Sequence, residues 1–232
     1  MRMDLKSILI LFTLILGNIN VWGQIKDSVK VATPLRYTPH QLIVPVSLLA
    51  LGTGSTLFFK NSIKYYISGE RAEHIPNFNT SIDNYLQYAP IPIAYALDFI
   101  GFKSKTDIEN RSVILIKAEL LTIASTNILK YTTKERRPDG SSNYSFPSGH
   151  TSQAFTAATF LSEEYKDRFP WMPYVAYSMA TATGILRVAK NRHYIGDVLF
   201  GAGLGILSTK VSYWTHQYKW GKKHHHVDYD YH

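Results

Sequence analysis

Three short segments in the second half of the chain contain residue types that can bind and transfer an anion. The first is KYTTKERRP, in which Lys130 precedes Arg137 by seven residues. That spacing is two turns of an α-helix, so we expect both basic side chains to project from one face of a helix that Pro138 ends. Two cations beside a chain reversal suit an anionic group such as a phosphate.

The second segment is PSGH, from Pro147 to His150. Proline suits the first position of a helix, where its missing N–H is no loss, so we expect a new helix to begin at Pro147. The free N–H groups of its first turn, near Ser148 and Gly149, then point at any anion that lies there. Gly149 has no side chain to keep a phosphate away, so this segment predicts an anion-binding helix start.

The third segment is RVAKNRHYIGD, which contains Arg187, His193 and Asp197. The histidine and the aspartate are four residues apart, so on a helix the carboxylate can hold the imidazole in one tautomer. Arg187 can offer a bidentate fork to phosphate oxygens. Each segment alone is usually a turn, a helix end or a surface contact. Their joint occurrence, in order and with fixed internal spacings, is strong evidence for a phosphate-transfer site.

The three segments together resemble the type 2 phosphatidic acid phosphatase superfamily, which also includes class A acid phosphatases and vanadium haloperoxidases. The family pattern is Lys-x6-Arg-Pro, then Pro-Ser-Gly-His, then Ser-Arg-x5-His-x3-Asp, and the resemblance covers roughly residues 112–214. Leu186 stands where the family has a serine. The spacer between Pro138 and Pro147 is shorter than the family usually shows, which suggests a site open to a large headgroup.

The resemblance implies a mechanism. His193 would attack phosphorus and form a phosphohistidine, Asp197 would orient it, and His150 would act as general acid and then as base. Three fixed cations can replace a metal ion, so we expect neither a metal nor a cofactor. The phosphate-binding residues implied by the resemblance are Lys130, Arg137, Ser148, Gly149 and Arg187.

These residues must be positioned by helices, because no segment shows the sustained alternation of a strand and Pro and Gly fall mostly at the joints. We therefore predict an all-α fold, a helical bundle of about six core helices. The predicted helices span residues 41–59, 88–102, 112–129, 148–165, 171–189 and 194–214.

Some features of the sequence favour insertion of the helices into a membrane, and others oppose it. Residues 41–59 carry no charge and are just long enough to span a bilayer, and the GAGLG run from Gly201 allows close helix approach. Against this, SEEYKDR follows Pro147 after only about 15 residues, and Lys117 and Glu119 would be costly facing lipid. We predict a bundle that is membrane-associated or partly membrane-embedded.

The N-terminus has the form of a secretory signal peptide, with an uncleaved anchor as the alternative. A basic start is followed by an apolar run from Ile8 to Leu16 and by small residues before Gln24. We therefore expect export to the cell envelope, with the site facing the periplasm. The predicted organisation is a signal segment 1–23, a lead segment 24–39, a helical phosphatase domain 40–218 and a polar His-rich tail 219–232.

The composition of the chain limits the classes of molecule that it is expected to bind. The formal net charge of +8 favours anionic partners, no nucleic-acid module accompanies it, and the absence of cysteine excludes disulfides and thiolate metal sites. HYIGDVLFG resembles the lipid-phosphatase version of the third motif, which implies a phosphorylated envelope lipid. We favour lipid A over phosphatidate-type lipids and undecaprenyl diphosphate. The alternatives are a soluble periplasmic acid phosphatase of broad specificity and a catalytically silent membrane scaffold.

Overall fold

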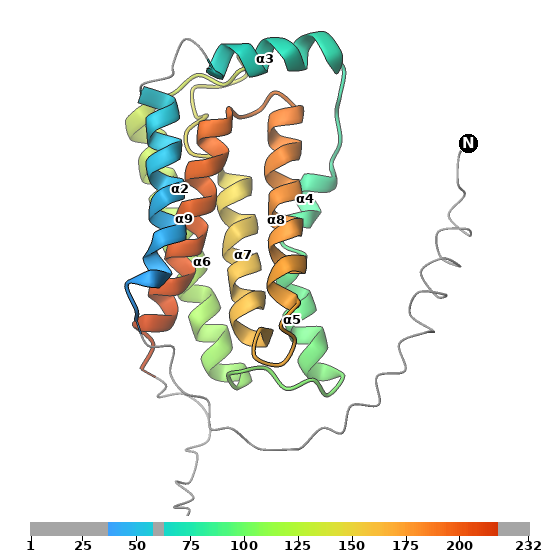
Figure 1. Cartoon of the computed structure of the whole chain (residues 1–232), viewed down its shortest axis with the longest axis vertical. Helices are drawn as coiled ribbons and strands as arrows, with labels where there is room; N and C mark the ends of the chain where they lie inside the picture. Colours follow the sequence, from blue (N-terminus) through green and yellow to red (C-terminus); the bar gives the residue numbers. More distant parts are fainter. Residues whose placement is uncertain (1–36, 58–62, 218–232) are drawn as a thin grey trace, which may run out of the picture. The chain divides into compact units, whose positions relative to one another are not determined.

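The computed structural model describes residues 37–57 and 63–217, and this part of the chain is helical, without a β-strand (Figure 1). The all-α prediction is therefore confirmed. The predicted signal segment and the predicted tail lie outside the described residues. The helices are α2 (His40–Leu57), α3 (Ile63–His74), α4 (Ile82–Leu86), α5 (Pro90–Phe99), α6 (Ile108–Thr133), α7 (Gly149–Tyr165), α8 (Met172–Ala189) and α9 (Ile195–Trp214).

The six predicted core helices correspond to α2 and to α5 through α9. Two further helices, α3 and α4, were not predicted. The α3 sequence, IKYYISGERAEH, has no sustained apolar face, and α4 has only five residues, too few to show a periodic pattern. Both precede the region that carries the sequence motifs.

Helix α7 lies at the centre of the bundle. It packs against α5, α6, α8 and α9, and α9 in turn packs against α2 (Figure 1). Short connections join α7 to α8 and α8 to α9, so these neighbouring helices run in opposite directions. The longer loop after α6 returns to the same end of the bundle, where Lys130 near the end of α6 donates to the Pro147 carbonyl oxygen just before α7. This topology brings the end of α6, the start of α7, the end of α8 and the start of α9 to one end of the bundle.

Glycines on α9 allow close packing on two sides. A methyl group at Gly205 would lie 2.3 Å from the Ser152 carbonyl oxygen of α7, and one at Gly203 would lie 2.7 Å from the Pro45 carbonyl oxygen of α2. Both distances are shorter than any real contact of this kind. Helix α9 therefore meets α7 and α2 backbone to backbone, as predicted from the GAGLG run.

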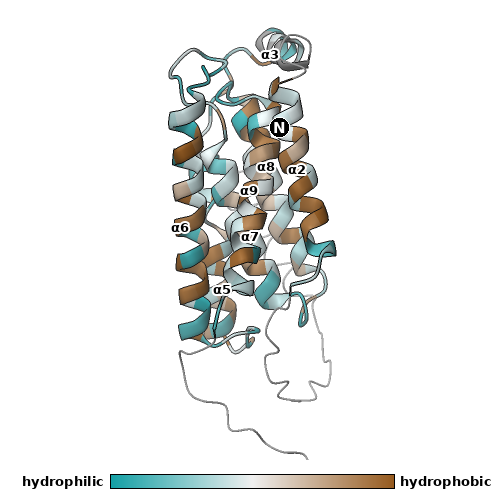
Figure 2. Cartoon of the chain, turned by 90° about the vertical axis from the view of Figure 1, so that its left-hand side faces the viewer, coloured by the Kyte–Doolittle hydropathy of each residue, from teal (hydrophilic) through white to brown (hydrophobic). Residues whose placement is uncertain are grey.

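The bundle buries many small polar side chains beside its apolar core and exposes many large apolar ones. The interior face of α7 is small and polar, with Thr151, Ser152 and Thr156 fully buried. Large apolar side chains instead lie exposed on α6, where Leu120 is 63% and Ile128 is 63% accessible. Figure 2 shows the same apolar bands along α6 and α2. Such exposed apolar faces mark a surface that contacts lipid.

Three helices are long and apolar enough to cross a membrane by length and composition: α2, α6 and α9. The charged residues that argued against insertion do not face outward. Lys117 donates to the Ser212 carbonyl oxygen at 3.1 Å, and Glu119 accepts from Gln153 at 2.6 Å. The membrane association predicted from the sequence is therefore supported, and polar groups at membrane depth are bonded within the protein.

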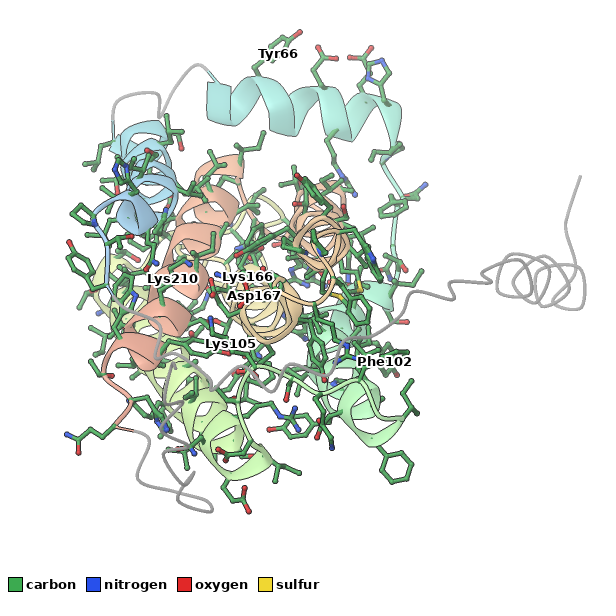
Figure 3. The ribbon with its side chains drawn as sticks, turned by 60° about the horizontal axis from the view of Figure 1, so that its bottom comes forward. Tyr66, Phe102, Lys105, Lys166, Asp167 and Lys210 are labelled. Carbon is green, nitrogen blue, oxygen red and sulfur yellow. The ribbon has the colours of Figure 1, made fainter. Side chains whose placement is uncertain are left out.

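The acidic end of α7 is also inside the protein. Glu163 and Glu164 are 3% and 2% exposed. Glu163 binds Lys166 at 2.6 Å and Lys210 at 2.7 Å, in the cluster that Figure 3 shows around the end of α7. Glu164 accepts hydrogen bonds from Thr106 and Tyr213. The short apolar length of α7 therefore reflects a central helix whose charges are paired inside the bundle.

Candidate active site

All eight residues predicted for the site come together at one end of the bundle, from four separate segments. Lys130 Nζ donates to the Pro147 carbonyl oxygen at 2.8 Å, which joins α6 to the start of α7. The Ser148 N–H donates to the Asp197 carbonyl oxygen at 3.0 Å, which joins α7 to α9. Arg137 and Arg187 are close enough to repel each other electrostatically. The grouping predicted from sequence spacing is therefore present in three dimensions.

The predicted reason for the Lys130–Arg137 pairing was wrong. Helix α6 ends at Thr133, and Lys134 caps it in the left-handed conformation with φ of 47°. Arg137 therefore lies in a loop, not on the face of a helix that Pro138 ends. Its backbone N–H donates to the Ser142 carbonyl oxygen at 2.9 Å, so a local loop bond fixes its position.

The helix start at PSGH also differs from the prediction. Helix α7 begins at Gly149 with Ser148 as N-cap, so Pro147 lies outside the helix. The Ser148 N–H is used by Asp197, and its hydroxyl pairs with Thr151 Oγ1 at 2.9 Å. The amides left for an anion are those of the first turn from Gly149 onward, which have no acceptor within the helix. Gly149 lies against the Lys130 side chain.

His193 and Asp197 meet across a helix start and not along one helix. Helix α9 begins at Ile195, so His193 precedes it and Asp197 occupies its first turn. Asp197 Oδ2 accepts from the Tyr194 N–H at 3.0 Å and from the Ser145 hydroxyl, and it lies 3.5 Å from His193 Nδ1. That last distance is long for a hydrogen bond, so the carboxylate faces the imidazole without a close bond and would attract it once the ring gains a positive charge. The helix cap fixes the carboxylate that faces the imidazole.

Both histidines are held neutral in the protein alone. His193 is 2% exposed, and burial lowers its pKa to about 4 despite the nearby Asp197. Burial and the neighbouring Arg187 lower the pKa of His150 to about 4. Burial and Arg187 also lower the pKa of Arg137. The common cause is that several positive charges lie close together where water is excluded. A bound anion would reduce the repulsion between them.

Several buried polar atoms of the site have no hydrogen-bond partner among the described residues. They are Arg137 Nε, Arg187 Nε, His193 Nδ1 and Asp197 Oδ1. Buried polar groups in folded proteins are nearly always bonded, so such a concentration requires an explanation. Two arginine Nε–H donors beside a neutral imidazole suit an oxyanion with several acceptor oxygens. The arrangement can therefore bind a phosphate and place it next to a nitrogen nucleophile.

Four residues that contact the site were not predicted. Ser145 donates to Asp197, Asp83 binds Arg187 and Lys190, and Asn84 contacts His150. The fourth residue, Lys190, lies within the third sequence segment but was not assigned to the site. Asp83 and Asn84 lie more than 60 residues from their partners in a segment without a motif, so no local spacing could have indicated them.

A cavity of about 1090 Å³ opens next to Arg137, between α2, α6, α9 and the loop after α6. Its wall is charged on one side and apolar on the other. The charged side has more basic than acidic residues, and the residues of the two sides are Lys134, Glu135, Arg136, Arg137 and Asp139, and Leu129, Phe146 and Phe200. A ligand with an anionic head and an apolar chain matches both parts of this wall. The predicted open access beside the short loop is consistent with this cavity.

No group of three His, Asp or Glu side chains that could hold a metal ion occurs within residues 37–57 and 63–217. The expectation of a metal-independent reaction remains a prediction, which a chelator can test.

Known proteins resemble the chain in sequence and in structure. Residues 111–221 match the PAP2 superfamily. A lipid A 1-phosphatase of Porphyromonas gingivalis is 36% identical over 139 residues, which cover 60% of this chain and 31% of that protein. A lipid A 1-phosphatase of Helicobacter pylori is 29% identical over 144 residues, which cover 56% of this chain and 68% of that protein. The chain thus matches about a third of the length of the Porphyromonas protein.

Two solved structures are also similar. LpxE of Aquifex aeolicus has a TM-score of 0.47 and 22% identity, over 62% of this chain and 92% of that one. A transmembrane PAP2 type phosphatidylglycerolphosphate phosphatase from Bacillus subtilis has a TM-score of 0.44 and 23% identity, over 73% of this chain and 94% of that one. Residues 111–221 of this chain match the PAP2 superfamily, and this match covers every predicted site residue.

Proposed function

We propose that this protein is a phosphatase of the bacterial cell envelope that removes a phosphate from a lipid, through a phosphohistidine intermediate. One observation carries the proposal. Three basic side chains converge with two neutral histidines, and both arginines keep a buried Nε–H that has no partner within residues 37–57 and 63–217; the basic residues are Lys130, Arg137 and Arg187. This combination supplies an anion cradle and a nitrogen nucleophile together.

In the first step, His193 Nε2 attacks phosphorus, since Nδ1 faces Asp197. A P–N bond forms as the bond between phosphorus and the lipid oxygen breaks, and His150 gives a proton to that oxygen. The negative charge of the bound phosphate raises the pKa of His150 from its value in the free protein, so that His150 can carry this proton. Asp197 stabilises the positive charge that develops on His193.

In the second step, His150 takes a proton from a water molecule, whose oxygen attacks the phosphohistidine. The P–N bond breaks, its electron pair returns to His193 Nε2, and inorganic phosphate leaves. The basic side chains and the first-turn amides of α7 bind the equatorial oxygens in both steps. In-line positioning and charge neutralisation are the main requirements of phosphoryl transfer, and these groups supply both.

A lipid substrate is supported by the surroundings of the site. The cavity beside Arg137 has an apolar wall and a charged wall in which basic residues outnumber acidic ones, and α2 and α6 expose apolar faces to their surroundings. Two relatives are named as lipid A 1-phosphatases, so we propose a phosphate of lipid A as the substrate. We further propose that the site faces the periplasm, in line with the predicted export signal.

The soluble acid phosphatase remains the second candidate, because the phosphate-binding groups alone would serve a small ester equally well. The scaffold hypothesis is weakened by the complete set of reactive residues at the site. Substrate preference separates the three hypotheses.

The test is phosphate release by the full chain, purified in detergent micelles with EDTA present. Lipid A and p-nitrophenyl phosphate are compared in parallel. We expect release from lipid A, with a kcat/KM at least about tenfold above that for the soluble ester. Equal or better turnover of the ester would favour the soluble acid phosphatase, and no release from either would favour the scaffold.

The intermediate is tested separately by rapid quenching with lipid A that carries ³²P in its phosphate. We expect label on the protein that survives base and is lost in acid, as for a phosphorus–nitrogen bond. Label that survives acid but not base would contradict the phosphohistidine.

A further inference from the structure

The short helix α4 contacts the candidate site through two adjacent residues, Asp83 and Asn84. Asp83 is fully buried, and its carboxylate accepts from Arg187 Nη1 at 2.8 Å and from Lys190 Nζ at 2.9 Å. Asn84 Oδ1 lies 2.9 Å from His150 Nε2. A helix of five residues has little stability of its own, so these contacts with α7 and α8 hold it in place.

The Asp83 contact orients the guanidinium of Arg187. The carboxylate occupies Nη1, whereas Nε is buried and has no partner among the described residues. The edge of the guanidinium that carries Nε is therefore left for phosphate oxygens. Burial by itself raises the pKa of Asp83, but hydrogen bonds from Lys190 and Arg187 outweigh it and hold the pKa below its usual range. Asp83 is thus an anion that anchors both cations.

The Asn84 contact decides which nitrogen of His150 reacts. An amide oxygen only accepts hydrogen bonds, so Nε2 carries a hydrogen that it donates to Asn84. Nδ1 is then the nitrogen that exchanges a proton with the substrate and with water. The same contact restricts rotation of the ring.

We propose that Asp83 and Asn84 are positioning residues of the site: Asp83 turns the Nε edge of Arg187 toward the phosphate, and Asn84 fixes the ring orientation and tautomer of His150. The proposal rests on the proposed function. Because the two residues are adjacent, one short helix sets both the anion cradle and the proton donor. The segment that does so lies outside the residues that match the PAP2 superfamily.

Asn84 is tested by kinetics on the full chain. Asn84→Ala should lower kcat for lipid A about 10- to 100-fold with KM changed less than about threefold, since an acid–base group is misplaced while the cradle stays intact. Asn84→Asp keeps an acceptor oxygen and should recover kcat to within about threefold of wild type. Tyr85→Ala, at the exposed next position of α4, is the matched control and should change neither constant.

A wild-type kcat in Asn84→Ala would overturn the role of Asn84. An equal loss of kcat in Tyr85→Ala, or no recovery in Asn84→Asp, would show that α4 acts only as packing and would overturn it as well.

Asp83 is tested by binding, which needs no turnover. Isothermal calorimetry with inorganic phosphate should show about tenfold weaker binding to Asp83→Asn than to wild type, while Asn84→Ala binds phosphate normally. Thermal unfolding of each variant in detergent identifies those that have lost the fold. Equal phosphate affinity in Asp83→Asn would overturn the role of Asp83. A wild type that binds phosphate but releases none from any substrate would refute the proposed function alone.

Discussion

The two ends of α7 each bury a charged cluster, and the clusters differ in one respect. At the far end, Glu163 and Glu164 have hydrogen-bond partners on each carboxylate, from lysines or from Thr106 and Tyr213. At the site end, buried nitrogen atoms of two arginines and of His193 lack partners among the described residues. The two carboxylates of one cluster are hydrogen-bonded within the protein, whereas the other cluster has buried donors without partners in the described part of the chain and an excess of positive charge.

This difference indicates that one cluster stabilises the fold, whereas the other binds a ligand. A saturated buried cluster contributes to the fold, because removal of one member leaves another charge without a partner. A cluster with unpaired buried donors destabilises the fold, and binding of a complementary anion removes this cost by supplying the missing acceptors. We therefore expect substitutions at the two ends of the same helix to have opposite consequences for activity and for stability.

The largest effect is expected at the nucleophile. His193→Ala should lower phosphate release by about 10⁴-fold or more, since the nucleophile of a covalent mechanism is lost. Thermal unfolding should be little changed, because Nδ1 of the deleted ring has no hydrogen-bond partner in the described part of the chain. Phosphate release and unfolding in detergent measure the two effects, with the exposed His74→Ala as control. Near-normal activity would refute the mechanism.

A smaller loss is expected at the orienting carboxylate. Asp197→Asn should lower kcat by about 10³-fold, by analogy with other carboxylate-oriented histidines. The amide can still accept from Ser145 and Tyr194, so the helix cap should survive. Steady-state kinetics and circular dichroism check both parts. A full rate in this variant would show that Asp197 has only a structural role.

At the C-terminal end of α7 we expect a loss of stability and little change in activity. Glu163→Gln leaves Lys166 and Lys210 without their common counter-charge and should lower the free energy of unfolding by about 3 kcal/mol. We expect kcat to stay within about twofold of wild type. Chemical denaturation in micelles, with the exposed Glu109→Gln as control, gives the measurement. A greater loss of activity than of stability would contradict the contrast between the two ends.

An effect of a different kind concerns the response to acid. His150 and His193 have pKa values lowered to about 4 from 6.5, so the unfolded chain binds more protons than the folded one between these values. Stability should therefore fall as pH drops from about 6.5 to 4. His193→Gln should flatten this dependence, which unfolding temperatures measured at a series of pH values can test. An unchanged slope would show that His193 is not held neutral by burial.

The sequence predicted which residues lie together better than it predicted the geometry that joins them. Motif spacing identified His193 and Asp197, but it placed them on one helix, whereas the structure places His193 before the helix start. The six apolar helices were predicted because each is a long segment without strand periodicity. Asp83 could not be predicted, because its meaning depends on a contact with Arg187 across 104 residues of chain. Long-range pairing of isolated polar residues leaves no local pattern.

The backbone contact of α9 has a consequence for engineering. A methyl group at Gly201 would lie 2.8 Å from the Ser148 carbonyl oxygen, so the start of α7 and the helix that carries Asp197 touch without an intervening side chain. The register between the two halves of the site is thus set by main chain alone. The lipid-facing side chains of α6 can be redesigned for another detergent or bilayer, while any side chain added at Gly201 would shift the two halves of the site against each other.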